Sequence, residues 1–281
     1  MISQPNNVKD GVILNTSGKL RFLADNSPLP IYRPSVGGGE ARLDLAGRFE
    51  KREVAILDGR ELTESFSLDQ QGFQLLSHES AVTNLFDERE RNGRYEAECR
   101  ELVSEATGAI RAHCFDHTLR SADADRREEM SIREPTTVIH NDYTPRSGRQ
   151  RVCDLMGDEV DSLLQKPFSI VNVWRPLKPV ETFPLVVCDA QTVDAEHLVV
   201  TERRARDRVG ELYMMRFASK QRWIYFSGMT PSEVLLIKTY DSREDGRARW
   251  CAHTALNDRD RKPDAVARES IETRVFAFFD A

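Results

Sequence analysis

The spacing of apolar residues differs between the two halves of the chain. Between residues 81 and 107 apolar side chains recur every three or four positions, which predicts a helix with one buried face. Asn92-Gly93 could divide this helix, and Gly108 is a suitable residue to end it. A second stripe of the same period predicts a helix over residues 152–165. Both stripes are interpreted as faces that pack on a core.

From residue 136 onward the pattern changes to short β-branched and aromatic runs separated by turns with Gly or Pro. These runs predict a series of strands. Sequential short strands with such turns favour a sandwich or a jelly roll, with the earlier helices supporting one sheet. The expected fold class is therefore mainly β with a helical buttress. The predicted strands cover residues 168–174, 185–188, 222–226, 233–240, 250–256 and 270–279.

The first fifth of the chain has a different composition. Residues 1–50 are rich in Gly, Pro and Asn and are expected to form an N-terminal arm with short strands near 11–14 and 20–23. Residues 51–281 are expected to form a single domain, since this length can bury one large core. The chain has no apolar run of about 20 residues, so no membrane span is expected.

Charge and cysteine usage restrict the class of protein further. The formal net charge of −6 disfavours nucleic acid as a partner. The five cysteines show no Cys-x-x-Cys spacing, which is typical of reduced thiols rather than a zinc site or a disulfide scaffold. The N-terminus also lacks the basic and apolar segments of a signal peptide. A cytoplasmic location is therefore expected.

The most specific chemical signal is His140-Asn141-Asp142, together with His253 later in the chain. Residues i and i+2 of a strand point to the same face, so one strand can present both His140 and Asp142. Two histidines and one carboxylate are the ligand set of the facial triad that holds non-haem Fe(II) in oxygenases. Such a triad leaves three positions on the iron open for a chelating cosubstrate and O2.

The spacing alone does not establish a metal site. A chain with 6 His and 46 acidic residues contains a His-x-Asp or His-x-Glu pair about once by chance. The β-branched run of residues 136–139 before His140 favours a strand at this position. The alternative interpretation is a solvated His beside an Asp in a turn.

Six short motifs occur in an order that is more specific than the His-x-Asp pair. In this order the chain resembles Fe(II)/2-oxoglutarate enzymes related to the cephamycin cephem-methoxylation protein and the fungal gibberellin desaturase. The resemblance covers about residues 55–279 and implies a double-stranded β-helix, the jelly roll of cupin-like proteins. The motifs occupy residues 115–120, 140–143, 172–176, 222–226, 252–255 and 268–274.

The resemblance implies Fe(II) and 2-oxoglutarate as cofactor and cosubstrate, with His140, Asp142 and His253 as metal ligands. Arg268-Glu269-Ser270 matches the Arg-x-Ser pattern that opens the last strand of many such oxygenases. Arg268 and Ser270 would share a face and bind the distal carboxylate of 2-oxoglutarate together. Arg274 would lie on the same face and is the competing anchor. For either arginine, the alternative is a surface ion pair with a neighbouring glutamate.

Further residues are candidates for supporting roles. Asn172, on a central strand, could bind cosubstrate or orient a ligand, although a structural hydrogen bond is equally expected. Tyr143 follows Asp142 directly and could contact substrate or cosubstrate. Arg120 and Arg175 could meet an anionic substrate, with a salt bridge as the alternative. Trp174 is expected in the core.

The resemblance also suggests the reaction class. Related halogenases replace the carboxylate ligand by a small residue, whereas this chain keeps Asp142. The expected activity is therefore hydroxylation, desaturation or oxidative rearrangement of a small secondary metabolite with O2. Two alternatives remain open: an iron enzyme that uses O2 without 2-oxoglutarate, and a non-catalytic binding partner in a biosynthetic pathway.

Overall fold

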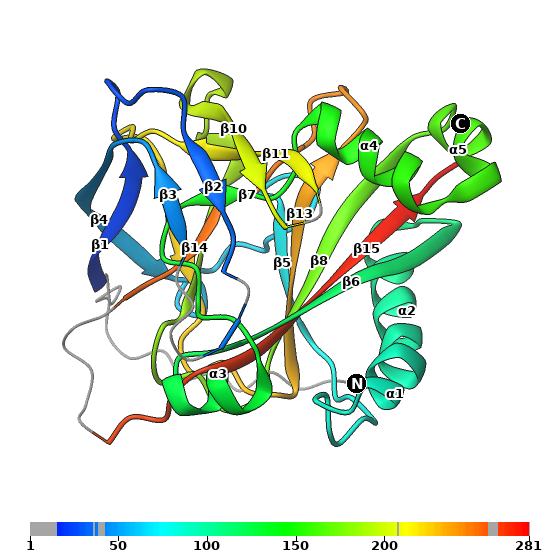
Figure 1. Ribbon diagram of the computed structural model, residues 1–281, viewed down its shortest axis with the longest axis horizontal. Coiled ribbons are helices and arrows are strands. Elements are labelled where there is room, and N and C mark those ends of the chain that lie inside the picture. Colours follow the sequence, from blue (N-terminus) through cyan, green and yellow to red (C-terminus); the bar gives the residue numbers. More distant parts are fainter. Residues whose placement is uncertain (1–15, 36, 39–42, 207, 258–263, 281) are drawn as a thin grey trace.

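Two curled β-sheets pack face to face in the computed structural model, which describes residues 16–35, 37–38, 43–206, 208–257 and 264–280 (Figure 1). The smaller sheet consists, in spatial order, of β5 (Phe73–Ser77), β13 (Glu233–Asp241), β8 (Phe168–Pro176), β15 (Glu269–Phe278) and β6 (Arg111–Ser121). The larger sheet consists, in spatial order within the described chain, of β1 (Thr16–Leu23), β4 (Phe49–Asp58), β12 (Trp223–Tyr225), β9 (Leu185–Cys188), β14 (His253–Ala255), β7 (His140–Asn141), β11 (Val209–Met215), β10 (Leu198–Arg204), β2 (Ile31–Arg33) and β3 (Asp44–Ala46).

This arrangement is the double-stranded β-helix that the sequence predicts. The chain crosses between the sheets at every step from β6 to β9 and again from β12 to β15, so β7 and β8, and β13 and β14, lie on opposite layers. Residues 16–46 supply three strands to the larger sheet, where β1 pairs with β4 and β2 pairs with β10. The strand expected near residues 11–14 lies outside the described residues.

The smaller sheet is covered on both faces, and its central strands show this in their burial. Every residue of β8 and β15 is buried. On the outer face, Val171, Ile271 and Val275 pack in one apolar cluster with helix α2 (Glu96–Thr107). On the inner face, β15 carries the polar side chains Ser270, Glu272 and Arg274. Since buried charges require partners, this polar row indicates where a functional site lies.

Helix α2 supports the smaller sheet, as Figure 1 shows at the side of β6 and β15. Its residues Cys99, Leu102 and Val103 are buried at helical spacing, and full burial of such an apolar side chain contributes about 1.5–3 kcal/mol. The helix ends at Gly108, whose φ of 70° satisfies the left-handed conformation of a C-cap. The predicted buttress and its end are confirmed.

The start of this helical region differs from the prediction. The helix does not begin at residue 81, because Asn84 forms a turn with Phe86 and Asp87 then caps the first turn of α1 (Glu88–Glu90). The division expected at Asn92-Gly93 is a π-helical turn, η1 (Arg91–Tyr95), which joins α1 to α2.

The helix predicted over residues 152–165 is wrong as a single element. Two helices replace it, α4 (Pro145–Leu155) and α5 (Val160–Leu164), with the 3-10 turn η2 (Gly157–Glu159) between them. Gly157 has a φ of 53°, which interrupts the helix. The earlier start is set by a capping box of Thr144 and Ser147 with Pro at the first turn.

Shorter elements complete the described chain. No described helix is long and apolar enough to cross a membrane.

The β10–β11 hairpin and β6 were not predicted as strands from the sequence, because their side chains are only partly buried and do not alternate clearly. The remaining elements are α3 (Ala124–Met130) and the 3-10 turns η3 (Ala190–Thr192) and η4 (Ala195–His197).

We expect all five cysteines to be free, with one reactive in the folded protein. Cys153 is exposed on α4, whereas the other four are buried. The thiolate is the reactive form, and burial raises the pKa of the Cys99 thiol to about 12. Thiol titration without reductant should give one fast group in the native protein and five after denaturation. Cys153→Ser should remove the fast group; several fast groups in that variant would contradict the assignment.

Candidate metal centre

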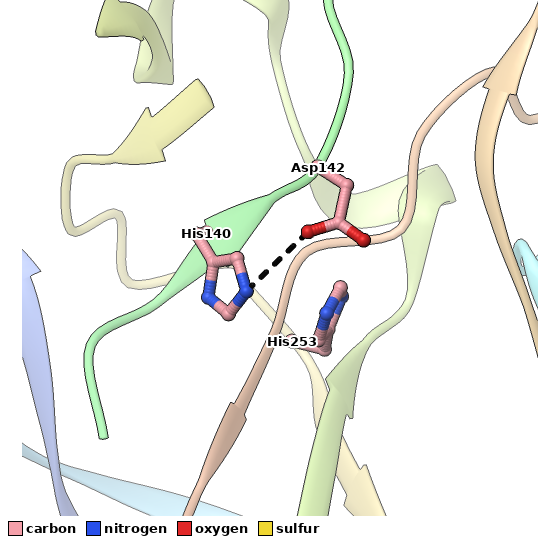
Figure 2. A group of neighbouring side chains, drawn as sticks. All are labelled: His140, Asp142 and His253. Carbon is pink, nitrogen blue, oxygen red and sulfur yellow. Dashed lines mark ion pairs between the residues drawn. The ribbon is translucent and has the colours of Figure 1, made fainter. Parts of the chain in front are cut away.

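The pairing of β7 with β14 brings two histidines together. His140 and His253 lie directly opposite each other in the antiparallel ladder, and their ring centroids are 4.6 Å apart. Both side chains are buried. Asp142, two residues after His140, points to the same face, as the strand period requires. Figure 2 shows the three side chains turned toward one another.

The ligand atoms of these residues converge on one point. His140 Nε2 lies 3.6 Å from Asp142 Oδ1, and the candidate ligand atoms of all three residues lie within 4.8 Å of one another (Figure 2). His140 Nδ1 donates to the carbonyl of Val138 at 2.9 Å, and His253 Nδ1 donates to that of Cys251 at 3.0 Å. These bonds fix each ring and leave each Nε2 lone pair for a metal ion.

The protonation states suit a cation. Burial, reinforced by the nearby His253, lowers the pKa of His140 to about 3, so its ring is neutral at physiological pH. Burial raises the pKa of Asp142, but Arg274 and the two histidines lower it by more, and the net pKa lies well below the usual range. A neutral imidazole and an ionised carboxylate are the forms that bind metal.

The second oxygen of Asp142 is held by protein groups. Asn172 Nδ2 donates to Oδ2 at 2.8 Å, and Arg274 Nε donates to the same atom at 3.1 Å. Thr239 Oγ1 in turn donates to Asn172 Oδ1 at 3.3 Å, which orients the amide. Asp142 Oδ1 is thereby aimed at the histidines. The structure thus places Asn172 beside Asp142, one of the three candidate ligands, where its amide can orient the carboxylate.

Arg274 is surrounded by acceptors. Besides Asp142, its guanidinium donates to Asp116 Oδ2 at 2.8 Å, to Thr118 Oγ1 at 3.1 Å and to Glu272 Oε1. Burial alone would lower the pKa of Arg274, but the three carboxylates raise it well above its ordinary value. Since its donors are occupied within the protein, Arg274 supports Asp142 rather than offering a fork to a ligand.

The surroundings of Arg268 differ from those of Arg274, because its donors are not all occupied within the described chain. It lines a small cavity of about 20 Å³ together with His140, His253, Trp174 and Arg120. Its guanidinium lies 5.4 Å from the centroid of the Trp174 ring, and Nη1 donates to the carbonyl of Phe183 at 2.6 Å. Arg268 Nε is buried without a hydrogen-bond partner in the described chain. Burial, with the nearby Arg120, lowers the pKa of Arg268 to about 9.

Two predicted site residues do not reach this cavity. Ser270 is buried but does not contribute to the cavity wall within the described chain. Tyr143 packs in the apolar cluster of Phe168 and Phe276, with its ring edge-on to Phe115 at 6.4 Å. Burial raises the pKa of Tyr143 to about 12, so its hydroxyl stays protonated. The structure therefore places Tyr143 in the core beside the site.

The cavity is also lined by Trp174 and Arg120, two residues that were weaker candidates for the site from the sequence. Trp174 was expected in the core, but it lies two positions after Asn172 on β8, and this even spacing could have placed it on the site face. Arg120 contributes its side chain from β6. Arg175 lies on the opposite face, where it donates to the carbonyls of His78 and Pro231.

A second group of potential ligands occurs at the surface. Asp194, Glu196 and His197 around η4 also have ligand atoms within 4.8 Å of one another. Asp194 and Glu196 are exposed, and Lys220 Nζ lies 2.6 Å from Asp194 Oδ2. An exposed carboxylate that is already neutralised by a lysine is a weak metal ligand compared with the buried triad.

Known proteins with similar sequences span nearly the whole chain. A family model described as the oxidoreductase/YMDC permease-like domain matches residues 21–278. The hydroxylase/desaturase efuI of Hormonema carpetanum is 33% identical over 91% of this chain and 95% of its own length. The Fe(II)/2-oxoglutarate-dependent dioxygenase nvfI of Aspergillus novofumigatus is 32% identical over 88% of this chain and 90% of its own.

Solved structures give the same result for the fold. The iron and alpha-ketoglutarate-dependent endoperoxidase NvfI superimposes with a TM-score of 0.80 at 27% identity, covering 95% of this chain and 99% of its own. A second conformation of that enzyme gives a TM-score of 0.83 over 97% of this chain. The sequence, the fold and the His140, Asp142 and His253 cluster agree, and the chain belongs to the family of Fe(II)/2-oxoglutarate-dependent oxygenases that contains these hydroxylases, desaturases and dioxygenases.

Proposed function

We propose that His140, Asp142 and His253 hold the Fe(II) of this oxygenase. The observation that carries the proposal is the convergence of ligand atoms from two buried histidines and one largely buried aspartate, whose other polar atoms are already engaged. When bound, Fe(II) together with 2-oxoglutarate and O2 would supply the oxidising power for removal of hydrogen from a substrate carbon. The residues of the chain hold the iron, fix the orientation of its ligands and exclude water from the reacting atoms.

We further propose Arg268 as the anchor for the distal carboxylate of 2-oxoglutarate, with Arg120 as a second cation on the same cavity. Support comes from its place beside His140 and His253 and from its unpartnered Nε. Arg274, the competing candidate, is engaged by three carboxylates. The cavity of about 20 Å³ is close to the size of one water molecule, so its lining side chains must move apart when the cosubstrate binds.

The substrate is a small molecule, and the relatives named above act as hydroxylases, desaturases and dioxygenases. Among the alternatives from the sequence, oxygen chemistry without 2-oxoglutarate and a non-catalytic role are both disfavoured by these relatives. We also propose that the enzyme works in the cytoplasm. Five cysteines without a disulfide support a reducing compartment.

Replacing His253 with Ala should remove tight binding of Fe(II). Loss of a supporting partner alone weakens metal sites by about 10–100-fold, so loss of a ligand should cost at least about 100-fold. Anaerobic isothermal titration of Fe(II) is the measurement. His197→Ala is the matched control, since His197 belongs to the exposed group. Unchanged affinity in His253→Ala, or a loss in His197→Ala, would move the metal site.

Replacing Arg268 with Ala should raise the 2-oxoglutarate requirement sharply while iron stays bound. Removing one partner of a buried charge pair costs on the order of 2–5 kcal/mol, or tens to thousands of fold. The anaerobic visible charge-transfer band of chelated 2-oxoglutarate and the slow formation of succinate both report this step. A normal titration curve in Arg268→Ala would exclude it as anchor. An iron-loaded enzyme with neither signal would instead favour the oxygen-only or non-catalytic alternative.

Asn172→Ala and Arg274→Ala should weaken the binding of Fe(II) more than they raise the 2-oxoglutarate requirement. Both residues hold Asp142 Oδ2, so their loss should weaken Fe(II) binding by about 10–100-fold. The 2-oxoglutarate requirement, measured at saturating iron, should change far less than in Arg268→Ala. Iron titration of both variants beside Thr239→Val, which removes the outer hydrogen bond to Asn172 together with the one to the Ile170 carbonyl, completes the series. A larger effect of Arg274→Ala on 2-oxoglutarate than on iron would reassign the anchor.

A further inference from the structure

A wide cleft lies outside the metal site, at the edge of β6. Its volume of about 420 Å³ falls in the range of small-molecule sites, roughly 300–1,000 Å³. Its walls come from β6, the residues after α3, the end of β10 with the segment after it, α4 and η1. Among the described residues that line the cleft, five arginines and one aspartate carry its charge: Arg91, Arg133, Arg151, Arg203, Arg208 and Asp116.

The positive charge of this cleft is poorly compensated. Arg133 and Arg203 form no ion pair within the described chain. Arg151 and Arg208 share one carboxylate, Asp154, whose Oδ2 is 3.7 Å from each. Asp116, the only aspartate among the described residues of the cleft, is bound by Arg274. Such a concentration of cations is unexpected in a chain with a net charge of −6, because the arginines repel one another.

The repulsion is visible in individual side chains. Burial lowers the pKa of Arg133, and the positive charges of Arg120, Arg203 and Arg274 lower it further. Burial, Arg151 and Arg203 likewise lower the pKa of Arg208. Like-charge repulsion therefore acts among the guanidinium groups of the cleft. An anion bound among them would relieve this repulsion.

The cleft is one side chain away from the metal ligands. Arg274 Nη1 binds Asp116 on the cleft wall, and Arg274 Nε binds Asp142. Tyr32 stacks on His140, with ring centroids 6.2 Å apart. The inner cavity of about 20 Å³ is far too small for a substrate, whereas the neighbouring cleft is large enough.

We propose that this cleft receives the substrate and that the substrate is an organic anion, whose carboxylate or phosphate group binds between Arg133 and Arg203. This inference rests on the proposed iron site, because the proposal places the substrate next to that site. Arginine matches carboxylate and phosphate with paired hydrogen bonds, which would fix the orientation of the substrate toward the metal. The remaining arginines would draw the anion toward the cleft.

The test uses iron-free protein and a rigid fluorescent probe, naphthalene-2,6-dicarboxylate, which is too large for the inner cavity. Fluorescence titration should show binding, and the uncharged dimethyl ester should bind at least about tenfold more weakly. Arg133→Gln/Arg203→Gln should also weaken the dicarboxylate at least about tenfold, because hydrogen bonds to charged groups are lost. Arg48→Gln/Arg94→Gln is the matched control: both arginines are exposed, and the same charge is removed.

Three results would overturn the proposal: no binding to the unaltered protein at millimolar probe, equal binding of acid and ester, or equal losses in the two double variants. If the first double variant does not fold, Arg203→Gln alone replaces it, with Arg48→Gln as its control. The measurement needs neither iron nor 2-oxoglutarate. Succinate formation by the unaltered enzyme is scored separately, so a failure of the proposed iron site is distinguished from a failure of anion binding.

Discussion

The negative charge of Asp142 is the constraint on which the interior depends. A buried carboxylate is costly unless it is paired, and here one of its oxygens is held by Asn172 and Arg274 while the other faces two histidines. Arg274 is itself buried and requires Asp116 and Glu272 as further partners. This candidate metal ligand is thus connected through Arg274 to the polar inner face of β15. The same pairing leaves Asp142 ionised and aimed at the metal position before any ion binds.

The two arginines on this side of the jelly roll have different roles because their surroundings differ. Arg274 lies among carboxylates, so its charge is neutralised within the protein. Arg268 lies under Trp174 and near Arg120, with one donor unpartnered, so its charge favours an incoming anion. Arg133 and Arg203 resemble Arg268 in this respect, but they line the larger cleft outside the metal site. In the proposed arrangement, cations therefore lie at two places around the candidate metal centre: Arg268 for the cosubstrate, and Arg133 with Arg203 for the substrate.

The sequence predicts the layers of this fold better than it predicts where individual helices and strands begin and end. β9 and β15 were predicted within about one residue, because both are continuous apolar or buried runs between clear turns. The helix over residues 152–165 was wrong, because a left-handed Gly157 and a capping box at Thr144 determine its limits. The β10–β11 hairpin was missed, because its side chains are half-exposed and carry no regular alternation. Local signals that compete with hydrophobic periodicity account for most of these differences.

The sequence by itself determined the kinds of residue in the site and the shared face of His140 and Asp142, because strand geometry repeats every two residues. It also gave the order of motifs that indicates iron and 2-oxoglutarate chemistry. Only the tertiary structure decided that His253 lies opposite His140, because a ladder register joins residues more than a hundred positions apart. It also decided which arginine keeps an unpartnered donor within the described chain: Arg268 and Arg274 both have even spacing on one face, and the carboxylates of Asp116 and Asp142 bind Arg274. The arginine-lined cleft depends on five separate elements, so no local pattern could have indicated it.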